Sequence, residues 1–288
     1  MNTSARRNLL ALASGAIAVG ATSLVSSTAR AQAPASTGAS RTFVLVHGAW
    51  HGGWCWRAVA DRLRAAGHTV FTPTQTGLGE RNHLLARTNT LDIFIEDIAN
   101  VIEFEQLNDV VLVGHSFGGI PITGVADRMP GKIRHLIYLD SLILQDGQSA
   151  FSQLPPDVVA ARIKAADETS GGLSLPTPPA SALGIVREED QKSIGPRLTP
   201  HPLATYNTPL RLQNPVGNGV PRTYVTCTAP IYTPLAKTRE WVASQGWPML
   251  ELPTAHDAMI ASPTKLRLCS RKSLPSSLSD WSAGHRSN

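Results

Sequence analysis

The residues most suited to chemistry lie in the stretch VVLVGHSFGG, where Ser116 stands in a Gly-x-Ser-x-Gly pattern. The pattern directly follows an apolar stretch typical of a buried strand and directly precedes a predicted helix at about 118–129. A sharp strand-to-helix turn strains the serine backbone, so Gly114 and Gly118 must be small. The turn also places the hydroxyl at the helix N-terminus, where free amides stabilise negative charge. We therefore predict that Ser116 is a nucleophile, with a chance glycine turn as the alternative.

A serine hydroxyl is a weak nucleophile until a base removes its proton. The chain contains nine histidines. His256, in ELPTAHDAMI, follows the last predicted strand and comes after the serine, as the chain order nucleophile, acid, histidine requires. His115 lies inside the serine turn with its side chain directed away from that of Ser116, and His47 ends the first predicted strand. We therefore select His256 as the base, and the alternative is a loop histidine without a catalytic role.

Acyl transfer also needs two backbone N–H donors for the negative charge that develops on the carbonyl oxygen. Phe117, the residue after the nucleophile, is expected to supply one donor. The Gly-rich stretch HGAWHGGWCW allows a backbone to approach a ligand, and we expect Ala49 to supply the second donor. An ordinary tight connection would need the same glycines. Trp50, Trp54 and Phe151 are candidates to line an apolar pocket, although aromatic residues at such positions are as often part of the core.

The elements that must position these residues alternate short apolar strands with amphipathic helices. This alternation predicts an α/β fold with a mostly parallel sheet. Residues 143–221 interrupt it and are rich in Pro, Gly and Ser, with one plausible helix, PDVVAARIKAADE. So long an interruption within a compact domain indicates a functional lid. The predicted strands are RTFVLVHG, HTVFTP, DVVLVG, IRHLIYLD, RTYVTCT and PMLELP.

Five motifs, in this order and spacing, resemble the α/β-hydrolase superfamily: FVLVHGAWHGGWCW, LGER, VVLVGHSFGG, LIYLD and HDAM. They are most similar to the branch that contains plant methylesterases, hydroxynitrile lyases and small bacterial esterases, including those of the salicylate-ester type. The resemblance covers roughly residues 42–263. It implies helices on both faces of the sheet, a helical lid over an apolar pocket, and a Ser-His-Asp mechanism with no cofactor and no metal. The lyases carry a lysine directly after the histidine, whereas this chain has Asp257, so cyanohydrin cleavage is not expected.

The acid of the expected triad is absent from its usual place. In the plant members it lies in the loop after the strand that corresponds to RTYVTCT, and here Pro230 takes its position. The strand LIYLD ends on Asp140, at the sheet edge where such folds bind ligands. We therefore expect Asp140 to orient His256 and to stabilise its imidazolium form. Two alternatives stay open: Asp140 could cap the first turn of the lid, and Asp146 is a weaker candidate for the acid.

The activity expected from these residues is hydrolysis of small carboxylic esters through an acyl-enzyme intermediate. A small-molecule ester is the expected partner. A carbamate or amide hydrolase built on the same residues is one alternative. The other is a non-catalytic hydrolase scaffold that binds a small ligand, which the missing acid favours. The sequence does not predict the natural ester or the oligomeric state.

The two ends of the chain differ from its body. Residues 1–33 contain Arg6-Arg7, a short apolar run and Ala31-Gln32-Ala33, a pattern that resembles a twin-arginine export signal with its cleavage site. We expect export to the bacterial periplasm or beyond, with no stable membrane span after cleavage; an uncleaved anchor is the alternative. Residues 34–264 form the predicted hydrolase domain. Residues 265–288 are basic and Ser-rich, and are predicted to be poorly ordered.

Charge and cysteine content exclude other classes of function. The net charge is +5, but the basic excess lies in the two ends, and acidic residues slightly outnumber basic ones between them. Nucleic-acid binding is therefore not expected. Three cysteines with no zinc-site spacing indicate neither a disulfide framework nor a metal site. We expect Cys55 and Cys227 to be buried apolar residues.

Overall fold

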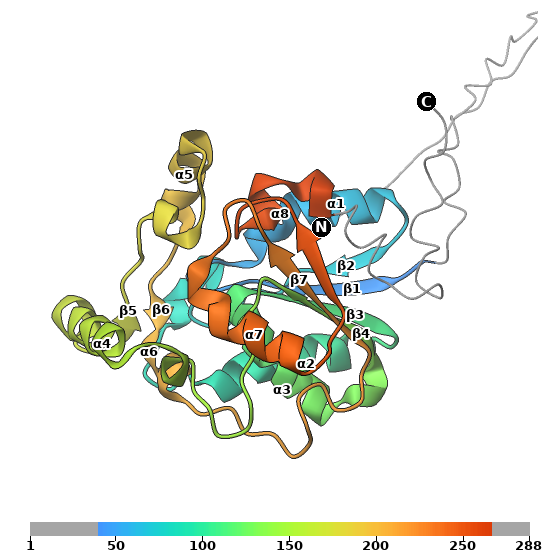
Figure 1. The fold of residues 1–288 in the computed structure, drawn as a ribbon, viewed down its shortest axis with the longest axis horizontal. Coiled ribbons are helices and arrows are strands. Elements are labelled where there is room, and N and C mark those ends of the chain that lie inside the picture. The colour runs from blue at the N-terminus through green and yellow to red at the C-terminus, as the bar shows by residue number, and fades with distance from the viewer. Residues whose placement is uncertain (1–39, 267–288) are drawn as a thin grey trace, which may run out of the picture. The chain divides into compact units, whose positions relative to one another are not determined.

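The computed structural model describes residues 40–266, and a six-stranded sheet forms the centre of this part of the chain (Figure 1). The strand order is β2-β1-β3-β4-β7-β8, and each neighbouring pair is parallel. Each strand corresponds to one of the six that the sequence predicts, so the predicted α/β class with a parallel sheet is confirmed. The strands are β1 (Thr42–Val46), β2 (Thr69–Phe71), β3 (Val110–His115), β4 (Ile133–Leu139), β7 (Arg222–Cys227) and β8 (Met249–Leu252).

Helices cover both faces of this sheet. Figure 1 shows α1 and α8 on one side and α2, α3 and α7 on the other. The side chains of β3 alternate between the two apolar cores: Val111 and Val113 pack in one, and Val110 and Leu112 in the other. A strand buried on both faces must be apolar at every position, which explains its continuous apolar sequence. The helices are α1 (Arg57–Ala65), α2 (Leu91–Phe104), α3 (Gly119–Arg128), α7 (Ala236–Ser244) and α8 (Ala258–Ala261).

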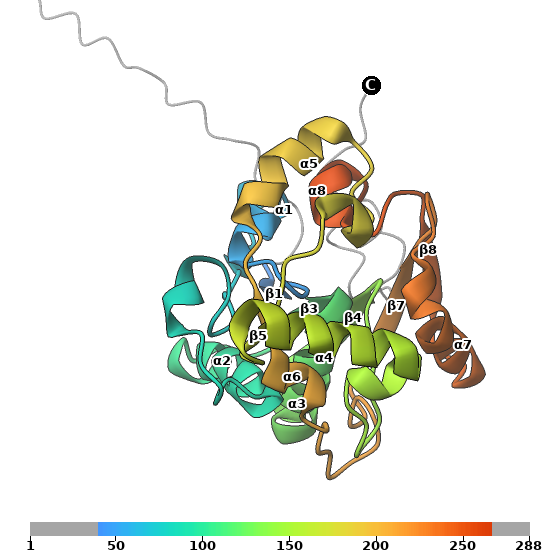
Figure 2. The same ribbon diagram turned by 90° about the vertical axis from the view of Figure 1, so that its left-hand side faces the viewer.

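The segment between β4 and β7 forms an insertion beside the sheet, and Figure 2 faces it. The predicted helix PDVVAARIKAADE is α4 (Pro156–Ser170), which ends at Gly171 in the left-handed conformation that favours glycine. Two shorter helices and a two-stranded antiparallel sheet complete the insertion. These are α5 (Glu188–Ile194), α6 (Leu203–Asn207), β5 (Ser174–Leu175) and β6 (His201–Pro202). Opening and closing of this segment as a lid stays a prediction.

Several predictions concern the ends of the chain. The predicted export signal, 1–33, lies outside the described residues, as do Cys269 and the tail beyond residue 266. Within residues 40–266, every helix is too short or too polar to cross a membrane.

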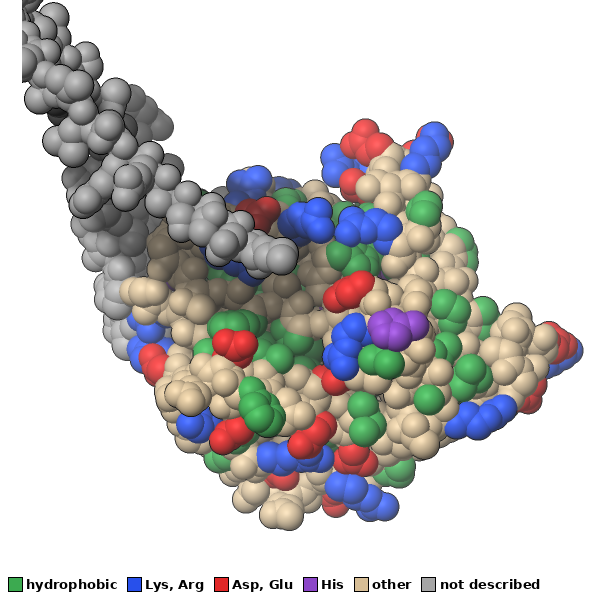
Figure 3. Space-filling view, turned by 180° about the vertical axis from the view of Figure 1, so that it is seen from behind, with side chains coloured by type: hydrophobic (Ala, Val, Ile, Leu, Met, Phe, Trp, Pro, Cys, Tyr) green, Lys and Arg blue, Asp and Glu red, His purple; other side chains and the backbone are tan. Residues whose placement is uncertain are grey.

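On the face of the molecule in Figure 3, basic and acidic side chains are interspersed, so that face has no extended region of one charge. Cys55 and Cys227 are buried, as expected.

Candidate active site

The turn that carries Ser116 has the strained geometry that the sequence predicts. β3 ends at His115, a single 3-10 turn covers Ser116–Gly118, and α3 begins at once. Ser116 has φ of +52°, in the left-handed region that side chains other than glycine rarely adopt. A Cβ atom on Gly114 would lie 2.6 Å from the Gly118 carbonyl oxygen, and one on Gly118 would lie 2.6 Å from that of His47. Both glycines are therefore required for the turn to form and to pack against the β1 loop.

Ser116, His256 and Asp140 form a continuous chain of hydrogen bonds. The Nε2 atom of His256 lies 3.0 Å from the Ser116 hydroxyl oxygen, and its Nδ1 atom lies 2.7 Å from Asp140 Oδ2. His256 and Asp140 are both buried. The other candidate acid, Asp146, is instead exposed and accepts a hydrogen bond from the Leu212 amide. The structure thus brings together the three residues that the sequence selects, with Asp140 as the carboxylate on the imidazole.

The backbone of Asp140 is held by the sheet, because Asp140 directly follows the end of β4. Its N–H donates to the Val225 carbonyl at 2.7 Å, which continues the pairing of β4 with β7 by one residue. The second carboxylate oxygen, Oδ1, accepts a 3.4 Å hydrogen bond from the Cys227 amide and lies 3.7 Å from an Arg239 nitrogen. These contacts offset the cost of burying a charged carboxylate. Arg239 comes from α7, and nothing in its local sequence indicates this role.

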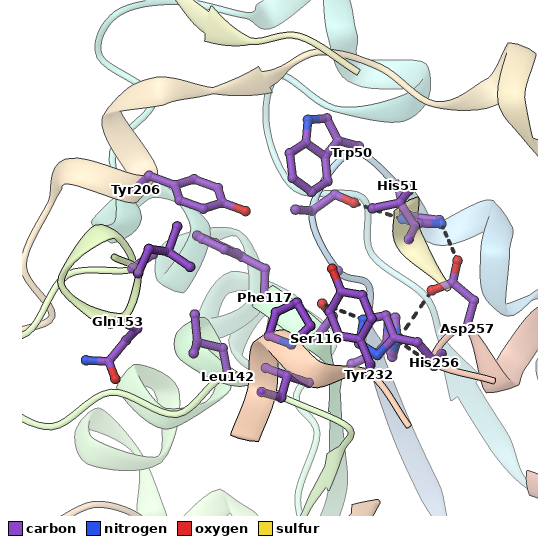
Figure 4. A pocket seen from close by; sticks show the side chains of 18 of the residues that line it. Trp50, His51, Ser116, Phe117, Leu142, Gln153, Tyr206, Tyr232, His256 and Asp257 are labelled. Atoms are coloured by element: carbon purple, nitrogen blue, oxygen red, sulfur yellow. Dashed lines mark hydrogen bonds and ion pairs between the residues drawn. The ribbon is translucent and has the colours of Figure 1, made fainter. Parts of the chain in front are cut away.

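The loop after β7, which lacks a carboxylate, contacts the His256 imidazole through Tyr232. The Tyr232 and His256 rings are stacked, with centroids 4.0 Å apart and planes 15° apart. Figure 4 shows this ring directly over His256. Burial raises the pKa of the Tyr232 hydroxyl, so the ring is neutral at neutral pH. The sequence does not predict this role for Tyr232, because a tyrosine in a loop has many possible positions.

Ala49 and Phe117, the predicted oxyanion donors, line the same cavity as Ser116. The β1 loop reaches the serine turn because Gly48 has no side chain: a Cβ atom there would lie 2.9 Å from the Ser116 Cβ. Trp50, which directly follows Ala49, has φ of +62°, so the loop turns sharply just past Ala49. The backbone around Ala49 and Phe117 is therefore held close to the nucleophile.

A second set of charged and polar groups lies buried beside the three residues of the hydrogen-bonded chain. Asp257 Oδ2 lies 3.2 Å from His51 Nε2, and Asp257 Oδ1 lies 3.5 Å from His115 Nε2. The other nitrogen of His51 lies 2.8 Å from the Ala49 carbonyl oxygen, and His115 Nε2 donates to the His256 carbonyl at 3.0 Å. We call His51, His115 and Asp257 the buried polar cluster. It connects the β1 loop, the serine turn and the His256 loop.

Two members of the buried polar cluster form an ion pair. Burial by itself would lower the pKa of His51, but the Asp257 carboxylate outweighs it and the pKa of His51 is raised. Burial by itself would raise the pKa of Asp257, yet His51 lowers that pKa to about 2. Burial lowers the pKa of His115 to about 3, with a further contribution from His256, so this ring is neutral.

The buried polar cluster also bears on metal binding. Potential ligand atoms of His115, His256 and Asp257 lie within 4.8 Å of one another. The ring nitrogens of His256, however, both make hydrogen bonds within the chain to Ser116 and Asp140. Asp257 is likewise paired with His51. A metal at this place would have to displace both sets of contacts.

The cavity in front of Ser116 is small, with a volume of about 70 Å³. Trp50 lines it, as predicted. The predictions for Trp54 and Phe151 were wrong. Trp54 packs its ring against Arg197, 4.0 Å from that guanidinium, and lines a different hollow; Phe151 is buried in the core against Tyr206. An aromatic residue type does not by itself show whether the side chain lines the cavity or packs in the core. Lining residues that the sequence did not indicate include Leu142, Gln153, Leu154, Arg162, Leu183, Tyr206 and Leu235.

Comparisons with known proteins agree with this geometry. Residues 43–275 match the model of the alpha/beta hydrolase family. The chain is 42% identical over 233 residues to the carbendazim hydrolyzing esterase of Nocardioides sp. (strain SG-4G), a match that covers 78% of this chain and 96% of that protein. It is 38% identical to methylesterase 9 of Arabidopsis thaliana over 102 residues, which are 35% of this chain and 40% of that protein. The extracellular alpha/beta-hydrolase from a Paenibacillus species superposes with a TM-score of 0.70 at 24% identity, over 81% of this chain and 98% of the other.

Proposed function

Because the chain belongs to the alpha/beta hydrolase family, we propose that it is a serine hydrolase that cleaves small carboxylic esters through an acyl-enzyme intermediate. The observation that carries this proposal is the chain of hydrogen bonds from Asp140 through His256 to Ser116, at the base of an open cavity. The relative from Nocardioides, which matches over nearly its full length, is named as an esterase, and so is the partial match from Arabidopsis thaliana.

In the proposed first step, His256 Nε2 removes the proton of Ser116 while the serine oxygen attacks the ester carbonyl carbon. Asp140, 2.7 Å from Nδ1, holds the tautomer with hydrogen on Nδ1 and stabilises the imidazolium that forms. His256 then gives its proton to the departing alcohol, and the acyl group stays on Ser116. Water, activated by the same imidazole, attacks the acyl-enzyme and releases the acid.

The backbone N–H groups of Ala49 and Phe117 are proposed to stabilise the tetrahedral intermediates. Each residue lines the cavity beside Ser116. Removal of one such donor in other hydrolases costs a factor of about 10² to 10³ in kcat. The close approach of Gly48 to the serine turn supports this assignment, because it brings the donor from the β1 loop close to the donor from the serine turn itself.

Hydrolysis of p-nitrophenyl acetate by the wild-type protein and by a Ser116→Ala variant tests this proposal. We expect turnover with a burst of p-nitrophenol in the wild type and its loss in the variant, together with covalent labelling of Ser116 by a fluorophosphonate. A wild-type protein that binds small esters but neither hydrolyses them nor reacts with the fluorophosphonate would instead be a non-catalytic binding protein.

We further propose that residues 1–33 direct export across a bacterial inner membrane by the twin-arginine route. The pair Arg6-Arg7, the short apolar run and Ala31-Gln32-Ala33 support this proposal. N-terminal sequencing of the protein recovered from the periplasm should begin close to residue 34, and Arg6→Lys with Arg7→Lys should leave the protein in the cytoplasm. An intact N-terminus in the membrane fraction would favour an anchor.

A further inference from the structure

Arg162 introduces a positive charge into a cavity that is otherwise apolar or electrically neutral. It lies on α4 of the insertion and lines the cavity together with Ser116. The other ionised groups on the cavity wall are Asp257 and His51, and they neutralise each other. On this wall His51 faces Asp257 and His256 faces Asp140, whereas Arg162 is a cationic side chain that faces no carboxylate.

Arg162 contacts two aromatic side chains, Trp50 and Tyr206, and it also donates a hydrogen bond to the Tyr206 hydroxyl. Its guanidinium carbon lies 5.9 Å from the centroid of the Trp50 ring and 5.7 Å from that of Tyr206. Among residues 40–266, no carboxylate forms an ion pair with it. Lys164, on the same helix, is by contrast exposed and lies 3.7 Å from Glu168. Arg239, near the other side of the site, faces Asp140. Arg162 is thus a half-buried cation held against aromatic side chains, and no carboxylate among the described residues is paired with it.

Occupation of the cavity changes the energetics of this cation. In the empty cavity, water solvates the guanidinium. A wholly apolar ester would displace this water without forming hydrogen bonds to the guanidinium. Removing a charge from water without a partner is costly. A carboxylate on the ester would replace the water with charge-assisted hydrogen bonds, for which the planar guanidinium is well suited. The cavity thus disfavours neutral substrates and favours anionic ones.

We propose that the preferred substrates are esters that carry a second, ionised carboxyl group, and that Arg162 binds this group. The inference rests on the proposed esterase function and narrows its substrate class. Arg162 acts here as a specificity-determining residue and takes no part in bond cleavage. Arginine stays charged across the pH range of ordinary assays, so the preference should hold wherever the ester's carboxyl group is ionised.

Two matched pairs of esters test the proposal. Mono-p-nitrophenyl adipate and p-nitrophenyl hexanoate differ by a terminal carboxylate on the acyl side; 4-acetoxybenzoate and 4-methylphenyl acetate differ by one on the alcohol side. For at least one pair, the wild type should show a higher kcat/KM for the anionic ester. In Arg162→Met this preference should fall about 10- to 100-fold, the value of one charge-assisted contact. Arg162→Lys should retain part of it, and Lys164→Met, which removes a charge from the same helix, should retain all of it.

The outcomes separate the two proposals. If the wild type hydrolyses neither member of either pair, esterase function fails; calorimetric binding of monomethyl adipate and methyl hexanoate to the Ser116→Ala protein then still tests Arg162. An equal loss for anionic and neutral esters in Arg162→Met would overturn the inference and leave Arg162 as a contact that holds α4 against Trp50 and Tyr206. A wild type that prefers the neutral ester in both pairs would overturn it as well.

Discussion

Replacement of Asp257 by asparagine should lower the free energy of unfolding. The loss should be largest in a limited pH range and smaller at both lower and higher pH. The carboxylate lies 3.2 Å from His51 in a fully buried position. Asparagine has nearly the same shape, so the packing is conserved and the charge is removed. His51 would then be buried without its counter-charge, and burial alone lowers its pKa.

The size of the effect follows from the pKa of Asp257, which falls from 3.8 to about 2 in the folded protein. A shift of nearly two units corresponds to about 2–3 kcal/mol of stability. Because the folded pKa is depressed, this stability is present above the unfolded value and is lost as the pH falls from about 4 towards 2. The pKa of His51 is raised, so its contribution is present below about 6.5 and is lost as the pH rises through its folded value. The pair therefore stabilises most between about pH 4 and 6.5.

Urea unfolding from pH 4.5 to 8.5, followed by the fluorescence of the six tryptophans, measures this contribution. The difference in unfolding free energy between wild type and Asp257→Asn should be greatest near pH 5–6 and should decline above pH 6.5. Asp97→Asn is the matched control, because Asp97 pairs with Arg81 at 3.1 Å and arginine does not titrate in this range. The difference in unfolding free energy between wild type and Asp97→Asn should stay constant from pH 6 to 8.5. A difference for Asp257→Asn that is equally constant, or smaller than about 0.5 kcal/mol, would refute the ion pair.

Two further substitutions probe the groups around His256. Asp140→Asn should lower kcat by about 10³- to 10⁴-fold at nearly constant KM and melting temperature, because an amide cannot hold the required tautomer or stabilise the imidazolium; Asp146→Asn should have no such effect, and an unchanged rate in Asp140→Asn would exclude Asp140 as the acid. Tyr232→Ala should lower kcat by about 10-fold through loss of the ring stacked on His256, whereas Tyr232→Phe should retain the activity; an equal loss in both would assign the effect to the hydroxyl instead of the ring.

The sheet and the nucleophile turn could be predicted because their signals are local. A strand buried on both faces is apolar throughout, as β3 is, and a serine at the end of such a strand needs small residues two positions away on each side. Asp140 could be predicted for a similar reason, since parallel strands bring their carboxyl ends to one sheet edge. Such a rule places the end of β4 near the end of β3, whatever the intervening sequence.

The rest of the site depends on contacts between segments that are far apart in the chain. His51 and Asp257 meet only because the β1 loop and the loop after β8 converge on the serine turn. Neither local sequence predicts that contact. Arg162 reaches the cavity through the fold of the insertion, which has no repeating pattern to read. The errors at Trp54 and Phe151 have the same origin, since a large aromatic side chain suits a pocket wall and a core equally well.

If Asp140, directly after β4, is the acid that we propose, the loop after β7 has a different task. His256 is held at Nδ1 by Asp140 and at Nε2 by Ser116, and its ring stacks on Tyr232. The backbone N–H of Asp140 donates to the Val225 carbonyl, so this residue is held by the sheet and not by a loop. On this proposal the loop needs no acid, and the Tyr232 ring stacked on His256 would limit rotation of the imidazole. General-base catalysis requires orientation within a fraction of an ångström, and we propose that a strand end and an aromatic face together provide it for His256.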